Sequence, residues 1–251
     1  MNELNKDIIL KDLPSKRLNL HIYDEIDSTN DEAKRIEGIK EFHIFIAEKQ
    51  TKGRGRHGKK WSSPNTGNIY MTISTNQNTS QISPISLISG LICKKAIDKL
   101  IRKSSIMLKW PNDILFNDKK IGGILVETEI NKENIKTIIG IGINLNINKE
   151  ESWWGDLSKF ALESKRNELI NLILAEFLNI FDNSYDNWVD DWKKSCMHIN
   201  KEIEIFDGEH LQKKAIFKDI DAQGNAVIES NEGEEVIALS LIHISEPTRL
   251  S

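Results

Sequence analysis

Residues 120–146, KIGGILVETEINKENIKTIIGIGINLN, hold two runs rich in β-branched residues on either side of a short polar connection. The runs cover 121–130 and 135–146, and the connection Asn131-Lys132-Glu133-Asn134 has the length of a hairpin turn. The stretch therefore predicts two antiparallel strands. Each strand carries glycines, which weaken pairing inside a strand, so we expect a ligand or another backbone to approach them closely. β-Bulges are the alternative interpretation.

Further strands and helices are predicted on the N-terminal side of this hairpin. Three more runs have strand composition, and two short runs lead into the hairpin: 18–23, 42–48, 68–74, 107–110 and 113–116. Capping residues and apolar spacing predict three helices. The first runs from Ser28 or Thr29 to Glu37, with Asp31 and Glu32 in capping-box positions and an exit at Gly38. The second runs from Ser83-Pro84 to about Lys103, and the third from about Asn167 to Trp192. Strands mixed with helices in this way predict an α/β or α+β domain.

The predicted pattern of secondary structure changes after residue 200. Short strand-like runs alternate with turns at Asp207-Gly208, 223–225 and 231–233, and the runs are 202–206, 213–218, 226–229 and 235–239. This pattern predicts a small antiparallel barrel after the larger domain. We place the two domains at 1–195 and 196–251.

Composition excludes several classes of protein. The chain has 251 residues and a formal net charge of −4, which argues against a protein that coats nucleic acid by charge alone. Its two cysteines, Cys93 and Cys196, offer neither a disulfide framework nor a CxxC zinc site. The N-terminus has no secretory pattern, and the longest nearly apolar run, 82–93, is too short to cross a bilayer. We expect a soluble cytoplasmic protein without a membrane partner.

One loop concentrates the positive charge. Residues 49–60, KQTKGRGRHGKK, contain four lysines, two arginines and no acid, so this stretch is +6 and the remaining chain is −10 against the total of −4. Its glycines let backbone N–H groups approach a ligand, and its arginines match phosphate or carboxylate oxygens. The loop predicts anion recognition; a solvated basic loop without a ligand is the alternative.

Two nucleotide-binding motifs match the spacing of residues in this loop but not the residues that follow it. Gly53-x-Gly55-x-x-Gly58 has the dinucleotide spacing, and Gly53-x-x-x-x-Gly58-Lys59 nearly has the Walker spacing. Both motifs must open a helix, whereas WSSPNTG follows at 61–67, and Lys60 stands where the Walker motif needs Ser or Thr. We reject both interpretations.

A second polar corner accompanies the loop. Lys109-Trp110-Pro111-Asn112-Asp113 places a proline and an aromatic ring between a cation and two polar side chains. Lys120 begins the first strand of the hairpin, and Asn144 is a polar residue among apolar neighbours at the end of the second strand. These segments together indicate one site.

The combination resembles the biotin protein ligases, in the same order and with similar spacing over nearly the whole chain. The matching segments are 28–30 (STN), 53–61 (GRGRHGKKW), 109–113 (KWPND), 120–127 (KIGGILVE) and 140–144 (GIGIN). The resemblance implies a catalytic domain related to class II aminoacyl-tRNA synthetases, with a mixed sheet, and a C-terminal SH3-like barrel. The ending 241–251, LIHISEPTRLS, does not match the family, so we expect a non-native or atypical tail there.

The resemblance also implies a reaction and its residues. The family joins biotin and ATP to biotinyl-5'-AMP with Mg²⁺ and then transfers biotin to a lysine of a biotin carboxyl carrier protein or domain. By the match, biotin contacts Ser28, Thr29, Asn30, Gln50, Arg54, Gly55, Arg56 and Lys120, and ATP contacts Arg54, Arg56, Trp61, Asn112, Lys120 and Asn144. Lys120, Arg56 and Asp113 are the catalytic candidates, with Asp113 receiving the proton of the acceptor lysine. The metal is expected on the ATP phosphates and not in a protein cage.

Other expectations complete this interpretation. Some members carry an N-terminal helix-turn-helix, and 27 residues before Ser28 are too few for one, so we expect no operator binding. The charged loop is expected to become ordered when an anionic ligand binds. A monomer or a homodimer is compatible with the sequence. The alternative functions are a lipoate ligase of the same superfamily and a non-catalytic RNA-binding protein that uses the loop as a phosphate clamp.

Overall fold

The computed structural model describes residues 3–37, 40–102, 106–131, 134–147, 151–207, 210–239 and 243–245. Its main element is a seven-stranded sheet in the order β1-β2-β3-β7-β6-β5-β4. Only β1 and β2 pair in parallel among these strands, so the sheet is mixed as predicted. The strands are β1 (Leu18–Ile26), β2 (Phe42–Gln50), β3 (Ile69–Thr75), β4 (Ile106–Lys109), β5 (Asp113–Phe116), β6 (Lys119–Asn131) and β7 (Asn134–Ile143).

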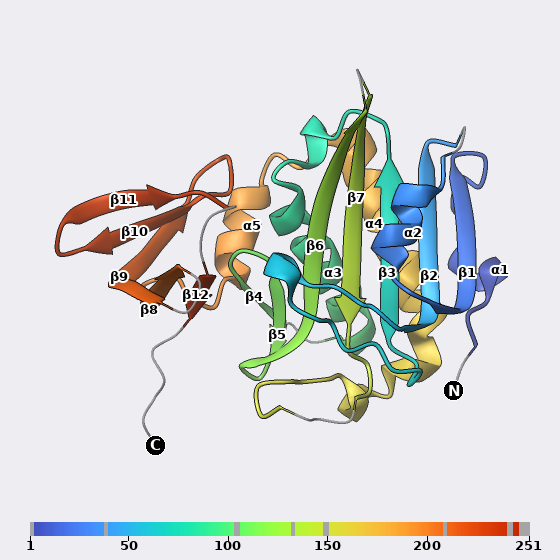
Figure 1. The fold of residues 1–251 in the computed structure, drawn as a ribbon, viewed down its shortest axis with the longest axis horizontal. Helices are drawn as coiled ribbons and strands as arrows, with labels where there is room; N and C mark the ends of the chain where they lie inside the picture. Colours follow the sequence, from blue (N-terminus) through green and yellow to red (C-terminus); the bar gives the residue numbers. More distant parts are fainter. Residues whose placement is uncertain are drawn as a thin grey trace.

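Helices cover both faces of this sheet (Figure 1). The short helix α2 lies on one face, and α3 and α4 lie on the other. The α-helices are α1 (Lys6–Ile9), α2 (Thr29–Arg35), α3 (Ile85–Ile101), α4 (Arg166–Asn183) and α5 (Trp188–Ser195). Single 3₁₀ turns lie at η1 (Arg56–Gly58), η2 (Ser80–Ile82), η3 (Ser158–Phe160) and η4 (Leu162–Lys165).

Alternation along β2 divides its side chains between the two layers. Ile44 and Ile46 join the large core formed with α3 and α4, whereas Phe45 packs with Ala33 of α2 in a smaller cluster. The first six residues of the strand, 42–47, are all buried because both faces of the strand are covered. The strand order thus places the N-terminus of α2 and the loop after β2 on the same face of the sheet (Figure 1).

The predicted hairpin is confirmed, with Ile130 opposite Ile135 near its turn. Its second strand ends at Ile143 and not at Asn146, because the next backbone groups leave the ladder. The N–H groups of Leu145 and Asn146 both donate to Oδ1 of the buried Asn68, at 2.7 and 2.9 Å. This anchor turns the chain away from the sheet where Asn144 lies.

The prediction of one long helix over 167–192 is wrong. Two helices, α4 and α5, occupy this region, and the chain turns between them at Ser184, whose φ of 60° lies outside the right-handed helical region. Both helices bury apolar faces in the same core, including Phe177 and Trp192. The spacing of apolar residues therefore continues across a break that it does not reveal.

The other two predicted helices are present with shifted ends. Ser28 caps α2 as predicted, since its Oγ accepts the N–H of Asp31 at 3.4 Å. The capping box does not form, because the Ser28 N–H donates to Asp27 Oδ1 at 2.7 Å and the Asp31 carboxylate pairs with Arg54. α2 ends at Arg35, before the predicted Glu37, and α3 ends at Ile101; the expected ends at Gly38 and Lys103 lie outside the described residues.

A second, antiparallel sheet follows α5 in the order β11-β10-β9-β8-β12. Its strands are β8 (Lys201–Asp207), β9 (His210–Ile220), β10 (Ala226–Ser230), β11 (Gly233–Ile237) and β12 (His243–Ser245). The last strand lies within the unusual ending and pairs with β8. Residues between the strands join the two parts of the chain: Trp110 Nε1 donates to the Gly224 carbonyl at 2.9 Å, and the Met197 N–H donates to the Leu108 carbonyl at 2.9 Å.

Candidate active site

A cavity of about 670 Å³ lies where the loop after β2 crosses the face of the large sheet. All twelve predicted site residues line it, although they come from six separate parts of the sequence. They are Ser28, Thr29, Asn30, Gln50, Arg54, Gly55, Arg56, Trp61, Asn112, Asp113, Lys120 and Asn144. The volume is that of an ordinary small-molecule site.

One part of the cavity is a connected set of neutral polar side chains. The backbone N–H and the hydroxyl of Thr29 both approach Gln50 Oε1, at 2.9 and 3.1 Å. Thr72 Oγ1 lies 2.8 Å from Thr29 Oγ1 and 2.7 Å from Asn30 Oδ1. Ser28, Thr29 and Asn30 are all buried at the start of α2. These side chains present donors and acceptors in fixed places to any ligand that reaches them.

The glycines of the hairpin make room for side chains of other segments. A Cβ at Gly142 would lie 2.6 Å from Cε2 of Trp61, and a Cβ at Gly140 would lie 2.3 Å from Oδ1 of Asn30. At these two glycines of β7 the close approach is therefore made by a side chain, whereas the expected approach of another backbone occurs at Gly122 of β6, where a Cβ would lie 2.8 Å from the Gly142 carbonyl oxygen. The register of β7 on β3 has no shift at Gly140 and Gly142, so these two glycines do not mark bulges, but the pairing of β5 with β6 shifts between Ile114 and Leu115, next to Gly122.

Trp61 closes this part of the cavity. Its ring lies over Gly142, and the Lys120 ammonium lies 5.5 Å from the ring centroid. The indole N–H is buried without a hydrogen-bond partner among the described residues. Such a donor costs free energy in a folded protein, and it is a feature that a bound acceptor would relieve.

The second part of the cavity is charged. Lys120 Nζ lies 2.6 Å from Asp113 Oδ1, across the β5–β6 pair. Asn112 holds this corner, because its Nδ2 donates to the Ile124 carbonyl at 2.9 Å and its own carbonyl accepts from the Ile124 N–H at 2.9 Å. Asn144 donates from Nδ2 to the Gly155 carbonyl at 3.1 Å. A cation and a carboxylate thus lie in direct contact within the cavity.

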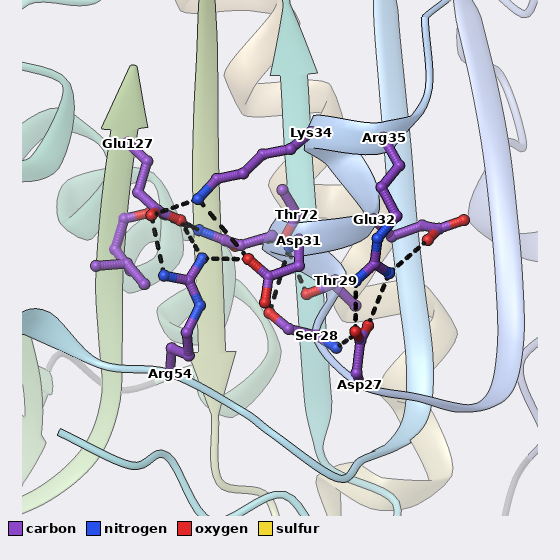
Figure 2. Close-up of polar contacts among 12 residues, drawn as sticks. Asp27, Ser28, Thr29, Asp31, Glu32, Lys34, Arg35, Arg54, Thr72 and Glu127 are labelled. Atoms are coloured by element: carbon purple, nitrogen blue, oxygen red, sulfur yellow. Dashed lines mark hydrogen bonds and ion pairs between the residues drawn. The ribbon is translucent and has the colours of Figure 1, made fainter. Parts of the chain in front are cut away.

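The two arginines of the loop have different partners. Arg54 turns back to the protein and pairs with Asp31 at 2.7 Å and with Glu127 at 2.8 Å (Figure 2). Arg56 donates from its guanidinium to the Leu239 carbonyl at 2.9 Å. Burial lowers the pKa of Arg56, and the nearby Asp113 carboxylate opposes this. The charge of the loop therefore includes arginine that is already paired with acids, which counting residues does not reveal.

Several residues that line the cavity were not predicted. Trp153 and Trp154 come from a segment joined to β6, where the Lys120 N–H donates to the Trp153 carbonyl at 3.0 Å. The adjacent tryptophans were the available signal, but no strand or helix pattern surrounds them. Glu127 lies outside the lining, and the sequence predicts no role for it, but the structure makes it a partner of Arg54.

Other kinds of site find little support in the described part of the chain. It contains no group of three His, Cys, Asp or Glu side chains arranged to hold a metal. Burial raises the pKa of both thiols, Cys93 and Cys196, to about 12, so neither is a ready nucleophile. None of the helices in the described ranges is long and apolar enough to cross a membrane.

Comparison with known proteins identifies the family. Residues 23–144 match the Biotin/lipoate A/B protein ligase family. The Bifunctional ligase/repressor BirA of Escherichia coli is 32% identical over 222 residues, which cover 82% of this chain and 68% of that protein. The chain thus belongs to the biotin protein ligase family, and the resemblance seen in the sequence is confirmed.

Solved structures of biotin protein ligases have the same fold. The enzyme from Aquifex aeolicus in complex with biotin and ATP superposes with a TM-score of 0.71 at 26% identity, covering 91% of this chain and 99% of that one. The enzyme from Leishmania major in complex with biotinyl-5-AMP gives a TM-score of 0.62 at 25% identity, covering 88% and 98%. The match extends over both sheets, because its coverage exceeds the larger sheet and its helices.

Proposed function

We propose that this protein activates biotin with ATP to biotinyl-5'-AMP and transfers the biotin to a lysine ε-amine of a biotin carboxyl carrier protein or domain. The observation that carries the proposal is that one cavity is lined both by the cations Arg56 and Lys120 and by a buried set of neutral hydrogen-bonding side chains. Biotin has a carboxylate and a neutral ureido ring. These two chemical characters match the two parts of the cavity.

The first step joins two anions. The biotin carboxylate attacks the α-phosphorus of ATP, a new P–O bond forms, and the bond to the β-phosphate oxygen breaks to release pyrophosphate. Positive charge must lie where these oxygens meet, and fixed cations in a partly buried site supply it effectively. We assign this role to Lys120 and Arg56. Trp61, Asn112 and Asn144 are assigned to the ATP side, with Trp61 as a flat surface next to the adenylate.

The ureido end of biotin is assigned to the neutral cluster. Each of its side chains is held by a hydrogen bond before a ligand arrives: Thr29 and Gln50 bond each other, Asn30 accepts from Thr72, and Ser28 accepts from the Asp31 N–H. Gly55 of the loop lines the same cavity, and we assign its open backbone to contact with biotin. Arg54 is assigned to the same end, where it ties the loop to α2 and β6.

The second step needs a deprotonated amine. The acceptor lysine attacks the acyl carbon of biotinyl-5'-AMP, an amide bond forms, and AMP leaves with its oxygen. We assign the removal of the amine proton to Asp113, whose carboxylate lies 2.6 Å from Lys120. Once the phosphate and carboxylate oxygens attract Lys120, the Asp113 carboxylate is left to accept a proton.

Mg²⁺ is proposed to enter with ATP. The cavity fits this ion, because the carboxylates of Asp113 and Asp118 offer oxygen donors beside the cations that bind phosphate. The phosphates would hold most of the coordination sphere, and these carboxylates could supply the remaining oxygen. When bound, the ion neutralises charge on the phosphate oxygens.

Finer features of the architecture belong to the same proposal. We place the catalytic domain at 1–195, related to class II aminoacyl-tRNA synthetases, and an SH3-like barrel at 196–251. Support comes from the helices on both faces of the large sheet and from the antiparallel order of the small one. We also propose a cytoplasmic monomer or homodimer with a carrier domain as its protein partner and with no nucleic-acid partner.

Pyrophosphate release tests this function against its competitors. The full chain is incubated with ATP and Mg²⁺ and with biotin, with lipoate or with neither. Release that depends on biotin supports the proposal, and release only with lipoate supports the lipoate ligase. Binding of a single-stranded RNA without pyrophosphate release in any mixture would support the phosphate clamp.

A further inference from the structure

Glu127 collects cationic and amide donors behind the cavity, without lining it. Its carboxylate accepts from Lys34 Nζ at 2.8 Å, from Arg54 at 2.8 and 3.1 Å, and from Asn30 Nδ2 at 2.9 Å. Figure 2 shows Lys34 of α2 and Arg54 of the loop after β2 reaching this carboxylate. Asn30 is the member of this group that lies in the neutral part of the cavity.

The charge state of Glu127 decides which way the Asn30 amide points. Burial alone would raise the pKa of Glu127, but hydrogen bonds from Lys34, Asn30 and Arg54 outweigh it and hold the pKa below its usual value. An ionised carboxylate has no proton to donate. Only the NH₂ group of Asn30 can therefore face Glu127, and the carbonyl Oδ1 must face the other way.

The surroundings of Asn30 leave the amide no other position. Oδ1 receives the Thr72 hydroxyl at 2.7 Å and lies over the Cα of Gly140, where a Cβ would come within 2.3 Å. The residue is 4% exposed. Reversal of the amide would place NH₂ against Thr72 and a carbonyl oxygen against the Glu127 carboxylate, two acceptors in contact.

The opposite end of the cluster is fixed by the backbone. The Thr29 N–H donates to Gln50 Oε1 at 2.9 Å, so Gln50 Nε2 points to Ser63 and donates to its hydroxyl at 2.9 Å. Ser63 in turn donates to the Trp61 carbonyl at 3.1 Å. The hydroxyls of Thr29 and Thr72 lie between the two acceptors Gln50 Oε1 and Asn30 Oδ1. The orientation of these two amides therefore decides where each hydroxyl proton points.

We propose that Glu127 is a positioning residue for biotin: it fixes the donor and acceptor pattern of the Asn30 side chain, and through Thr72 that of the neutral cluster which receives the ureido ring. This inference rests on the proposed function. A ureido ring has two N–H donors and one carbonyl acceptor, so a pocket with an inverted pattern loses hydrogen bonds to it. Discrimination by correctly placed polar groups is strong because mismatched groups remain unpaired when buried.

A purely structural role predicts something different. If Glu127 served only to hold Arg54, then the other partner of Arg54 would matter equally. That partner is Asp31, which lies 2.7 Å from Arg54, whereas the Asn30 amide donates to Glu127. The variant Asp31→Asn therefore weakens the Arg54 anchor and leaves the contact between Asn30 and Glu127 intact.

The test measures the binding of biotin alone and of ATP alone by calorimetry, with the full chain and three variants. Glu127→Gln has the same shape but presents an NH₂ group to the donors. We expect it to raise the Kd for biotin at least tenfold and to change the Kd for ATP less than twofold. Asp31→Asn should raise the Kd for biotin less than threefold. Glu129→Gln, two residues along β6 and outside the cavity lining, should leave both constants unchanged.

The outcomes distinguish a failure of the role of Glu127 from a failure of the proposed function. An unchanged Kd for biotin in Glu127→Gln, or an equal effect of Asp31→Asn, would overturn the role of Glu127. Equal losses for biotin and ATP in Glu127→Gln would also overturn it, since they would indicate general damage to the fold. A parent chain that binds no biotin would reject the proposed function itself.

Discussion

Gly142→Ala tests the placement of the Trp61 ring over Gly142 in the cavity. The new Cβ would lie 2.6 Å from Cε2 and 2.8 Å from Nε1 of the Trp61 ring. Carbon atoms in favourable contact are about 3.5 Å apart, so the ring must move by roughly 0.9 Å. The backbone itself accepts alanine, because Gly142 has no positive φ. The strain therefore falls on Trp61 and on its loop.

The size of the effect follows from what has to move. Overpacking costs about 1 to 3 kcal/mol, and we expect the lower end because Trp61 stands on a loop and is only partly buried. One kcal/mol corresponds to a loss of about 2 to 4 °C in Tm for a chain of this size. Displacement of the ring from the ATP side should raise the KM for ATP at least about tenfold, or about 1.4 kcal/mol.

Gly90→Ala is the matched control. Gly90 lies in α3, and its Cβ would meet Leu108 Cδ2 at 3.5 Å, an ordinary contact. Alanine in a helix interior stabilises by about 0.5 to 1 kcal/mol relative to glycine, so Tm should rise and the KM for ATP should stay constant. Thermal unfolding and pyrophosphate release measured on both variants give the comparison. A Gly142→Ala protein with the KM of the parent would refute the assigned position of Trp61.

Three further predictions concern the charged groups. Arg56→Gly should release biotinyl-5'-AMP and biotinylate nearby lysines promiscuously; equal retention of labelled adenylate by variant and parent would contradict this. Lys120→Gln should slow pyrophosphate release by about 100- to 1000-fold, with little change in urea unfolding because its ion pair is partly exposed; a variant with the rate of the parent would remove Lys120 from the catalytic groups. Burial, with smaller effects of Lys109 and Lys201, lowers the pKa of His198 to about 3. Below about pH 6.5 the unfolded state therefore binds a proton at His198 that the folded state does not bind. The free energy of unfolding should fall by up to about 1.4 kcal/mol for each pH unit below that value. In urea unfolding, the loss of stability between pH 7 and pH 5 should be smaller for His198→Gln than for the parent, and an equal loss would contradict the prediction.

The elements of the fold were largely visible in the sequence because their signals are local. Each predicted strand of the large sheet has a counterpart, and the glycines at 140 and 142 do lie at a close approach, although side chains make it and not a ligand or another backbone. The break at Ser184 was not visible, because Phe181 and Trp188 keep a helical spacing across it. Helical spacing reports which residues are buried, and it does not report whether one helix or two carry them.

The sequence predicted which residues form the site, but it did not predict which of their side chains contact each other. The residues gathered around the cavity were found from composition and from the family resemblance. Arg54 was expected to face ligand anions, but its pairing with Glu127 joins residues 73 positions apart, and no local pattern encodes that contact. The same holds for Trp153 and Trp154, which reach the cavity through backbone hydrogen bonds to β6.

The most direct test of the central claim is a complete reaction. The full chain is mixed with ATP, Mg²⁺, biotin and a purified biotin carboxyl carrier domain, and the products are identified by mass spectrometry. Biotin-dependent formation of AMP and pyrophosphate, together with one biotin in amide linkage to a carrier lysine, is the predicted result. A carrier domain that stays unmodified while the chain forms no biotinyl-5'-AMP would contradict the proposed function.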